Sequence, residues 1–273
     1  MESLTFNALG GECELYGINV EAAALRQGQT WITRMHDRLT RFEPNSELSR
    51  LNAAGGRWLR VSPELEALLR ESLRAFDLSD GLVNVAVLPA LLAAGYTRDF
   101  AAGPTARTAA PLIRPLPDVL DMRPGEARLA AGAALDLGGI AKGWLADRLA
   151  KDLGENVLVN LCGDLYARGG GTTGDGWPVG FGAKTLLLKD MGAATSGTTK
   201  RAWAGGHHLI DPRTGLPART DLSEVSVLAA TATDAEIYAK VALFLGASAA
   251  PNWLGSRSPG WSLVPTPPQR DTL

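Results

Sequence analysis

The chain has 273 residues, of which 45% are hydrophobic and 21% are charged, and its formal net charge at pH 7 is −2. This balance gives no electrostatic reason to expect a nucleic acid or an anionic membrane surface as a partner. No run of about 18 apolar residues occurs, and the first residues lack a basic segment followed by an apolar one, so we expect no membrane span and a cytoplasmic location.

The two cysteines, Cys13 and Cys162, are far apart in the sequence and lack the spacing of metal ligands. We therefore expect two buried thiols rather than a zinc site or a disulfide framework. The length permits one large domain or two modest ones.

The first half of the chain mixes extended and helical patterns. Leu4–Val20 alternates loosely around Gly10-Gly11, which predicts a strand or hairpin. Apolar residues at helical spacing predict a helix over 21–42, and Ser62-Pro63 has the pattern of an N-cap followed by a first-turn proline, so we expect a helix over 62–76. Composition predicts three further segments: a short helical turn at Ser46–Asn52, a strand or bend followed by a helical piece in Val83–Tyr96, and a long connection with a strand or two from Thr97 to Gly132.

The second half continues this alternation. Gly138-Gly139 precedes an amphipathic stretch that ends at Gly154, which predicts a helix with a glycine at its C-terminal end. The other predicted elements are strands at Asn156–Leu161, Pro178–Phe181, Thr185–Leu188, Val225–Ala230 and Trp261–Val264, a helix at Thr233–Leu245, and a partly irregular tail over 250–273.

Polar chemistry is concentrated in a loop at Ala194–Gly215. Thr195-Ser196-Gly197 offers small hydroxyls and a glycine, His207-His208 holds two of the three histidines, and Asp211-Pro212 opens a turn. An ordinary surface hairpin explains the stretch equally well.

A second segment of interest begins at Gly138-Gly139. A glycine turn that opens a helix presents free backbone N–H groups and the positive end of the helix dipole, which suits a phosphate or pyrophosphate. Close helix packing explains such glycines about as often. Asp164 follows a predicted strand and a glycine, which places a carboxylate at the end of that strand.

Six motifs, in this order, resemble those of the ApbE family of FAD:protein FMN transferases, and together they cover nearly the whole chain. They are RFEPNSELSRLN at Arg41–Asn52, LDLGGIAKGWLADRLA at Leu135–Ala150, VNLCGD at Val159–Asp164, ATSG at Ala194–Gly197, HLIDPRTG at His208–Gly215, and AEIYAKVALFLG at Ala235–Gly246.

The resemblance implies an α+β fold of mixed, mainly antiparallel sheets with packed helices, a single domain over residues 1–273 in two lobes with the flavin between them. It also implies an enzyme that binds FAD, cleaves its pyrophosphate with Mg²⁺, and transfers FMN through a phosphoester to a Ser or Thr of an acceptor protein. Such chemistry needs a cationic clamp, backbone donors for phosphate oxygens and a base for the incoming hydroxyl.

The resemblance also assigns site residues one by one. His208 matches the family's proposed base, whereas His207 has no match and is expected to be a loop side chain. For the carboxylates Asp136 and Asp164, the alternative is a structural role in a cap or turn. The positions matching the family's flavin-binding segments are Ser46, Glu47, Asp136, Gly138, Gly139, Lys142, Gly163, Asp164, Ser196, Gly197, His208 and Asp211.

The last helix departs from the family. Counting back from Gly246, the family has an Asp ten residues earlier and a Thr six residues earlier as magnesium ligands, where this chain has Glu236 and Lys240. Glu236 is the expected metal ligand, with Asp234 as its substitute. The alternative is a capping box over residues 233–236 that uses Glu236 at the helix start. A protonated lysine cannot be a ligand, so the ammonium of Lys240 would instead lie where the metal would be.

Two smaller departures concern Gly10-Gly11, where the family has Gly-Thr, and Val83-Asn84-Val85, which replaces an aromatic-Asp-Pro run. The sequence therefore leaves three functions open: the transferase, an FAD-binding protein of the same fold without transfer activity, and an FAD pyrophosphatase that releases FMN and AMP.

Overall fold

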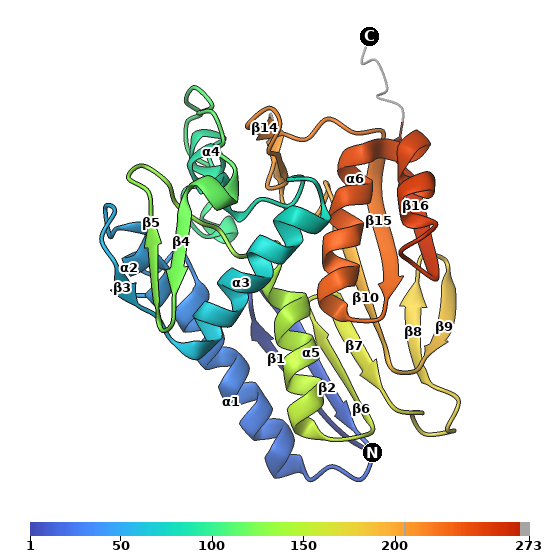
Figure 1. Ribbon diagram of the computed structural model, residues 1–273. Helices are drawn as coiled ribbons and strands as arrows, with labels where there is room; N and C mark the ends of the chain where they lie inside the picture. Colours follow the sequence, from blue (N-terminus) through green and yellow to red (C-terminus); the bar gives the residue numbers. More distant parts are fainter. Residues whose placement is uncertain (205, 268–273) are drawn as a thin grey trace.

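The computed structural model describes residues 1–204 and 206–267, and its centre is a seven-stranded sheet (Figure 1). Each pair of neighbouring strands in this part of the chain is antiparallel, which confirms the predicted α+β fold with mainly antiparallel strands. In spatial order the strands are β1 (Glu2–Ala8), β2 (Gly11–Gly17), β6 (Val157–Leu161), β7 (Asp164–Arg168), β10 (Met191–Gly197), β15 (Leu222–Ala229) and β16 (Gly260–Pro265).

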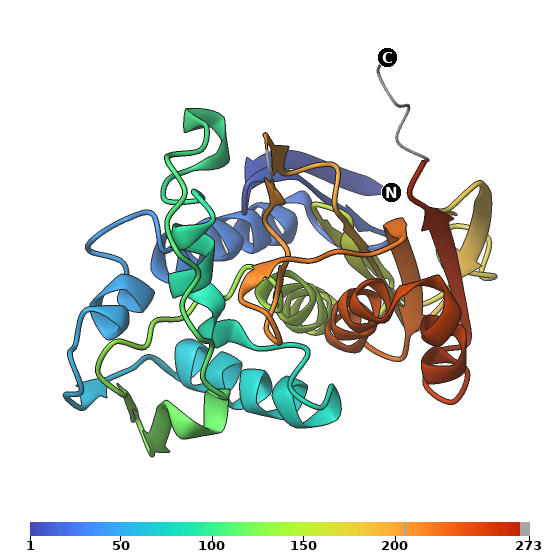
Figure 2. The ribbon, with the colours of Figure 1, turned by 90° about the horizontal axis from the view of Figure 1, so that it is seen from above.

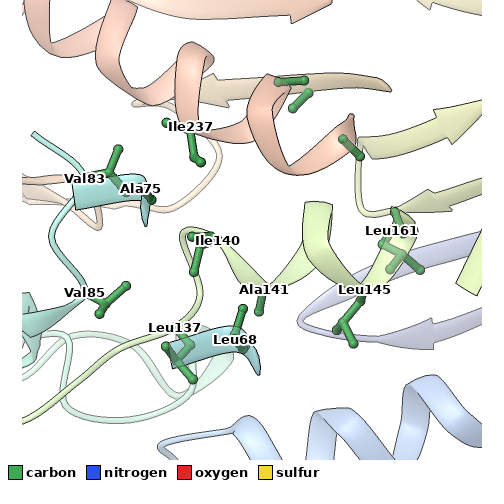
Figure 3. Close-up of a cluster of buried hydrophobic side chains, with 14 of the residues drawn as sticks. Leu68, Ala75, Val83, Val85, Leu137, Ile140, Ala141, Leu145, Leu161 and Ile237 are labelled. Carbon is green, nitrogen blue, oxygen red and sulfur yellow. The ribbon is translucent and has the colours of Figure 1, made fainter. Parts of the chain in front are cut away.

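Helices cover one face of this sheet in a layer, and one more helix lies outside that layer (Figure 2). The layer consists of α1 (Ala22–Leu39), α5 (Ala141–Leu153) and α6 (Ala232–Leu254), and the outer helix is α3 (Pro63–Leu78). Figure 3 shows the buried side chains between them, with Leu68 of α3, Leu145 of α5 and Ile237 of α6 in one apolar cluster. Burial of these faces supplies the main stabilising free energy of the fold.

The opposite face of the sheet is covered by a hairpin of β8 (Trp177–Phe181) and β9 (Lys184–Leu188). Trp177 packs there in a separate buried cluster with Leu158 of β6 and Leu228 of β15. The sheet is therefore buried on both faces at β15, where Glu224 is the only half-exposed residue of the eight in the strand.

A second, smaller part of the molecule lies beside the sheet and its helices (Figure 1). It contains α2 (Glu47–Asn52), α4 (Leu88–Ala93), a small sheet of β3 (Leu59–Arg60), β5 (Glu126–Leu129) and β4 (Leu120–Arg123), and short 3₁₀ turns at Val85–Val87, Phe100–Ala102 and Leu116–Asp118. Four short strands form two further hairpins, β11 (Ala202–Trp203) with β12 (Gly206–His207) and β13 (Ile210–Asp211) with β14 (Leu216–Pro217).

The helix predictions are confirmed, including the N-cap at Ser62, whose hydroxyl accepts a hydrogen bond from Leu65 N at 3.2 Å. The first part of α6 ends as predicted, because Gly246 has a φ of +77° and interrupts the helix. A second helical part then runs to Leu254, so the predicted irregular tail begins too early, and residues 268–273 of that tail lie outside the described part.

Two strands of the central sheet were not predicted. The expectation of a loop at Ala194–Gly197 is wrong, since these residues form the end of β10, and β7 was also missed. The composition of β10 is low in β-branched residues for a physical reason. A side chain at Gly192 would collide with the backbone of Thr231 and Ala232, so only small residues let the start of α6 approach the strand.

Within the described residues, each helix is either too short or too polar to traverse a lipid bilayer.

Candidate functional site

The start of α5 meets α6 in a close backbone contact at Gly143. A Cβ atom at this position would lie 2.5 Å from the carbonyl oxygen of Ala232, so the contact requires a glycine. The Gly143 N–H donates to Oε2 of Glu236 at 2.8 Å, and Glu236 is only 3% exposed. The two helices therefore hold a buried carboxylate between them.

Lys142 connects this carboxylate to the sheet. Its ammonium forms an ion pair with Oδ2 of Asp164 and lies 3.7 Å from Oε1 of Glu236. Asp164 is 1% exposed, and its other oxygen accepts a hydrogen bond from Thr195 N of β10 at 3.3 Å. Among the described atoms, Oδ2 has no partner besides the ammonium, so Lys142 is what compensates this buried charge.

Asp164 directly follows the tight turn between β6 and β7, which places its side chain near Lys142. The turn between β6 and β7 consists of Cys162 and Gly163, whose φ angles are +60° and +95°. A two-residue turn with positive φ at both positions matches the twist of the strands it joins. Gly163 is therefore explained by the turn, and its predicted contact with a ligand stays a prediction.

The Gly138-Gly139 turn precedes α5, and Lys240 of α6 reaches it. The Lys240 ammonium donates to the carbonyl oxygen of Gly139, and a Cβ at Gly139 would lie 2.5 Å from Nζ. The buried side chains of Leu137 and Ile140 anchor the turn on both sides (Figure 3). Desolvation lowers the pKa of Lys240.

Asp136 supports this turn from behind and is held by an arginine that the sequence did not single out. Oδ1 of Asp136 accepts from Gly138 N at 2.8 Å, and Oδ2 accepts from Nε of Arg41 at 2.6 Å. The guanidinium of Arg41 also lies 4.3 Å and 4.6 Å from the ring centroids of Phe42 and Tyr96. Arg41 opens the first family motif, which was the available signal, but its partner is 95 residues away.

Lys142, Asp164, Glu236 and Lys240 form the charged cluster of the site. His208 lies beside this cluster, and its imidazole is neutral. Burial lowers its pKa to about 3, and the positive charges of Arg201 and Lys240 add to the effect. Its Nδ1 lies 3.4 Å from the carbonyl oxygen of Arg201. Because a carbonyl only accepts, this contact assigns the ring proton to Nδ1 and leaves Nε2 able to accept one.

His207 uses both ring nitrogens within the fold. Nδ1 accepts from Leu209 N at 3.2 Å, and Nε2 lies 3.0 Å from the carbonyl oxygen of Ala218, to which it donates. These contacts fit the expected loop role.

A family model described as the ApbE family matches residues 10–263. The chain belongs to the ApbE family. It is 32% identical over 244 residues to the FAD:protein FMN transferase of Klebsiella pneumoniae (83% of this chain, 76% of that protein). It is 33% identical over 260 residues to the FAD:protein FMN transferase of Treponema pallidum (82% of this chain, 72% of that protein).

Solved ApbE structures share the fold. The flavinyl transferase ApbE of Pseudomonas stutzeri, in its apo form, superposes with a TM-score of 0.81 at 20% identity and covers 97% of this chain and 91% of its own. The ApbE protein of Thermotoga maritima superposes with a TM-score of 0.80 at 23% identity, with coverages of 93% and 89%.

Several residues matched to ApbE motifs have structural partners away from the cluster. Ser46 caps α2 by accepting from Ser49 N at 2.9 Å. Glu47 accepts from the backbone N–H and hydroxyl of Ser62 at 2.5 and 2.8 Å, which ties α2 to the start of α3. The carboxylate of Asp211 is bound by the guanidinium of Arg213. Their roles as FAD contacts stay predictions.

Ser196 and Gly197 lie closer to the cluster, at the end of β10 next to the Thr195 N–H that binds Asp164. Packing also favours a glycine at position 197, since a Cβ there would lie 3.1 Å from the carbonyl oxygen of Ser223, a tight contact.

The alternative of a capping box over residues 233–236 is wrong. The N-cap of α6 is Thr231, whose hydroxyl accepts from Asp234 N at 3.0 Å. Asp147 of α5 binds the N–H groups of Ala232 and Thr233 at 2.7 and 2.9 Å. Since these groups already cap the helix, Glu236 is free to face Gly143.

The side chains at the two positions where the family resemblance predicted magnesium ligands, Glu236 and Lys240, do not fit a magnesium site. Mg²⁺ prefers a near-octahedral shell of oxygen ligands. Here the oxygens of Glu236 face Gly143 N and Lys142, and the second ligand position holds the Lys240 ammonium. Asp234, the substitute ligand, pairs with Arg74. Within residues 1–204 and 206–267, no group of three His, Cys, Asp or Glu side chains gathers as a metal site would require.

The two cysteines are free thiols, and the fold brings them together beside the cluster. Their sulfur atoms are 3.8 Å apart, with Cys13 fully buried and Cys162 half-buried. A hydrogen bond from the Cys13 thiol lowers the pKa of Cys162 to about 7, with help from the charges of Lys142, Arg201 and Lys200. The same contact raises the pKa of Cys13.

Two surface pockets, of about 450 and 390 Å³, lie elsewhere. The first is near Val20 and Leu153, and the second is near Arg74 and Asp147. The candidate site is thus defined by its charges and its glycine turn.

Proposed function

We propose that this protein is an FAD:protein FMN transferase, which cleaves FAD and attaches FMN to a Ser or Thr hydroxyl of another protein. Its relatives from Klebsiella pneumoniae and Treponema pallidum carry this name at 32% and 33% identity over more than four fifths of the chain. FAD is the flavin substrate, and the acceptor protein is the second.

The observation that carries the proposal is the neutral His208 beside a cationic glycine turn. Cleavage of a diphosphate needs positive charge near the phosphates and a base for the attacking hydroxyl. Lys240 and the positive end of the α5 dipole supply the positive charge, and Nε2 of His208 supplies the base.

The reaction then proceeds as a single displacement. The acceptor hydroxyl attacks the flavin-side phosphorus, its proton passes to Nε2 of His208, and the bridging oxygen leaves with AMP. The bond between hydroxyl oxygen and phosphorus forms as the anhydride bond breaks. Binding of a dianionic diphosphate near His208 raises the pKa of its imidazole, which makes it a stronger base when substrate is present.

One observation favours a second function on the same scaffold, an FAD-binding protein without transfer activity. The two positions expected to hold a metal carry Glu236 and Lys240, and Glu236 is engaged by Gly143 and Lys142. If positive charge from lysines suffices to bind FAD but not to cleave it, the protein holds FAD intact.

Incubation of the purified protein with FAD and a candidate acceptor separates these functions. Covalent flavin fluorescence on the acceptor band supports transfer, free FMN and AMP indicate hydrolysis to water, and intact bound FAD indicates a binding protein. We expect His208→Ala to abolish covalent flavin while the Kd for FAD is retained. The control is His36→Ala, which changes the third histidine, on α1, and should leave transfer unchanged. Transfer by His208→Ala at the wild-type rate would contradict the assigned base.

A further inference from the structure

The charged residues around Glu236 and Lys240 do not fit a magnesium site. At the position where a metal ligand was expected, Lys240 directs a positive charge onto the Gly139 carbonyl. A carbonyl oxygen can bind either a metal cation or the ammonium group of a lysine. The lysine therefore occupies a carbonyl oxygen that a metal ion could bind.

The charges around Lys240 separate it from the other cations of the cluster. Lys142 is compensated by Asp164 and Glu236, and Arg41 is compensated by Asp136. For Lys240, by contrast, no carboxylate oxygen among the described residues lies within ion-pair distance. Glu236 and Asp136 act on its charge from farther away, and its ammonium donates to a neutral carbonyl oxygen, that of Gly139. A charge withdrawn from water without an opposite charge is costly, and a bound anion would relieve that cost.

The position of this ammonium suits a phosphate oxygen. It lies on the turn that leads into α5, where the positive end of the helix dipole also attracts anions. A divalent metal at the same place would be repelled by Lys240 and by Lys142. The arrangement thus favours direct binding of the diphosphate over binding through a metal ion.

We propose that the Lys240 ammonium replaces the divalent metal in this protein, so that the diphosphate of FAD is bound without Mg²⁺. This inference rests on the proposed function, because it assumes that FAD is the ligand. It assigns to one side chain of α6 a role that a dissociable ion would otherwise have.

The test is the affinity for FAD, measured by quenching of flavin fluorescence in excess EDTA and in excess magnesium chloride. For the wild-type protein we expect a Kd that agrees within about twofold between the two buffers. For Lys240→Thr we expect a Kd at least about tenfold weaker in EDTA, because a charge-assisted contact is lost, and a recovery in magnesium. Lys151→Thr, an exposed lysine in the last turn of α5, is the matched control and should behave as wild type.

Binding of Mn²⁺ alone, followed by electron paramagnetic resonance, is the second measurement. Wild-type protein should leave the free Mn²⁺ signal unchanged, whereas Lys240→Thr should reduce it. A wild-type Kd for FAD that strengthens tenfold or more on addition of magnesium would overturn the inference and leave the proposed function standing. Failure of the wild-type protein to bind FAD in either buffer would overturn both.

Discussion

Replacement of Gly143 by alanine tests whether α5 and α6 are in backbone contact beneath the charged cluster. The added Cβ would lie 2.5 Å from the carbonyl oxygen of Ala232, 2.7 Å from its carbonyl carbon and 2.8 Å from Thr233 N. All three are backbone atoms, so no side chain can rotate away and the helices must separate. Overpacking of this kind costs about 1–3 kcal/mol.

The same separation stretches the hydrogen bond from Gly143 N to Glu236, which adds about 1–3 kcal/mol for a buried acceptor left unsatisfied. The higher helix propensity of alanine returns at most about 1 kcal/mol. The expected net loss in the free energy of unfolding is therefore about 3 kcal/mol. For 273 residues this loss corresponds to a fall in Tm of about 5 °C.

Thermal unfolding followed by circular dichroism measures this loss, and Gly180→Ala is the matched control. Gly180 is an exposed position in β8, where an added Cβ meets no atom within 4 Å. We expect its Tm to change by less than about 1 °C. FAD affinity should also fall in Gly143→Ala, since Glu236 and Lys142 move with the helices. A Gly143→Ala protein with the stability and FAD affinity of the control would refute the helix contact as described.

Two further predictions concern titrating groups. The pKa of His208 is lowered from 6.5 to about 3 in the folded state, so the unfolded state binds the extra proton and stability falls as the pH drops from 6.5 towards 3, by up to about 1.4 kcal/mol per pH unit. Urea denaturation at several pH values should show a shallower loss for His208→Gln than for wild type, and equal slopes would contradict the burial of this imidazole. Alkylation of Cys162 by iodoacetamide should rise with a midpoint near pH 7, because its thiolate forms there, while Cys13 stays unmodified in the folded protein. Equal labelling of the two cysteines, read by peptide mass spectrometry, would be inconsistent with the buried position of Cys13.

The elements predicted correctly depend on neighbours in the sequence. The cap at Ser62, the end of α5 at Gly154 and the break at Gly246 each depend on residues within one helical turn. The apolar stripe of α1 likewise predicts which of its faces is buried. Local chemistry was sufficient for these features, because the same few residues carry both the pattern and the structure.

Predictions from neighbouring residues were wrong where a segment distant in the sequence makes the deciding contact. Residues 233–236 read as a capping box, yet Thr231 and Asp147 cap the helix and leave Glu236 to bind Gly143, 93 residues away. The small residues of β10 suggested a loop, because the sequence does not show that the start of α6 packs against Gly192. In both cases tertiary contact outweighs local propensity, whose contribution per residue is less than about 1 kcal/mol.

In the candidate site, too, some features could be predicted from short segments of the sequence and others depend on tertiary contacts. Motif order in the sequence was sufficient to indicate the family, the glycine turn before α5 and the histidine expected to act as base, since each is a property of a short segment. Only the tertiary structure decided that Lys142 pairs with Asp164 and Glu236, that Arg41 holds Asp136, and that Lys240 reaches Gly139. Charge pairing depends on distance in space, and the paired charges of this site are 22 to 95 residues apart in the sequence.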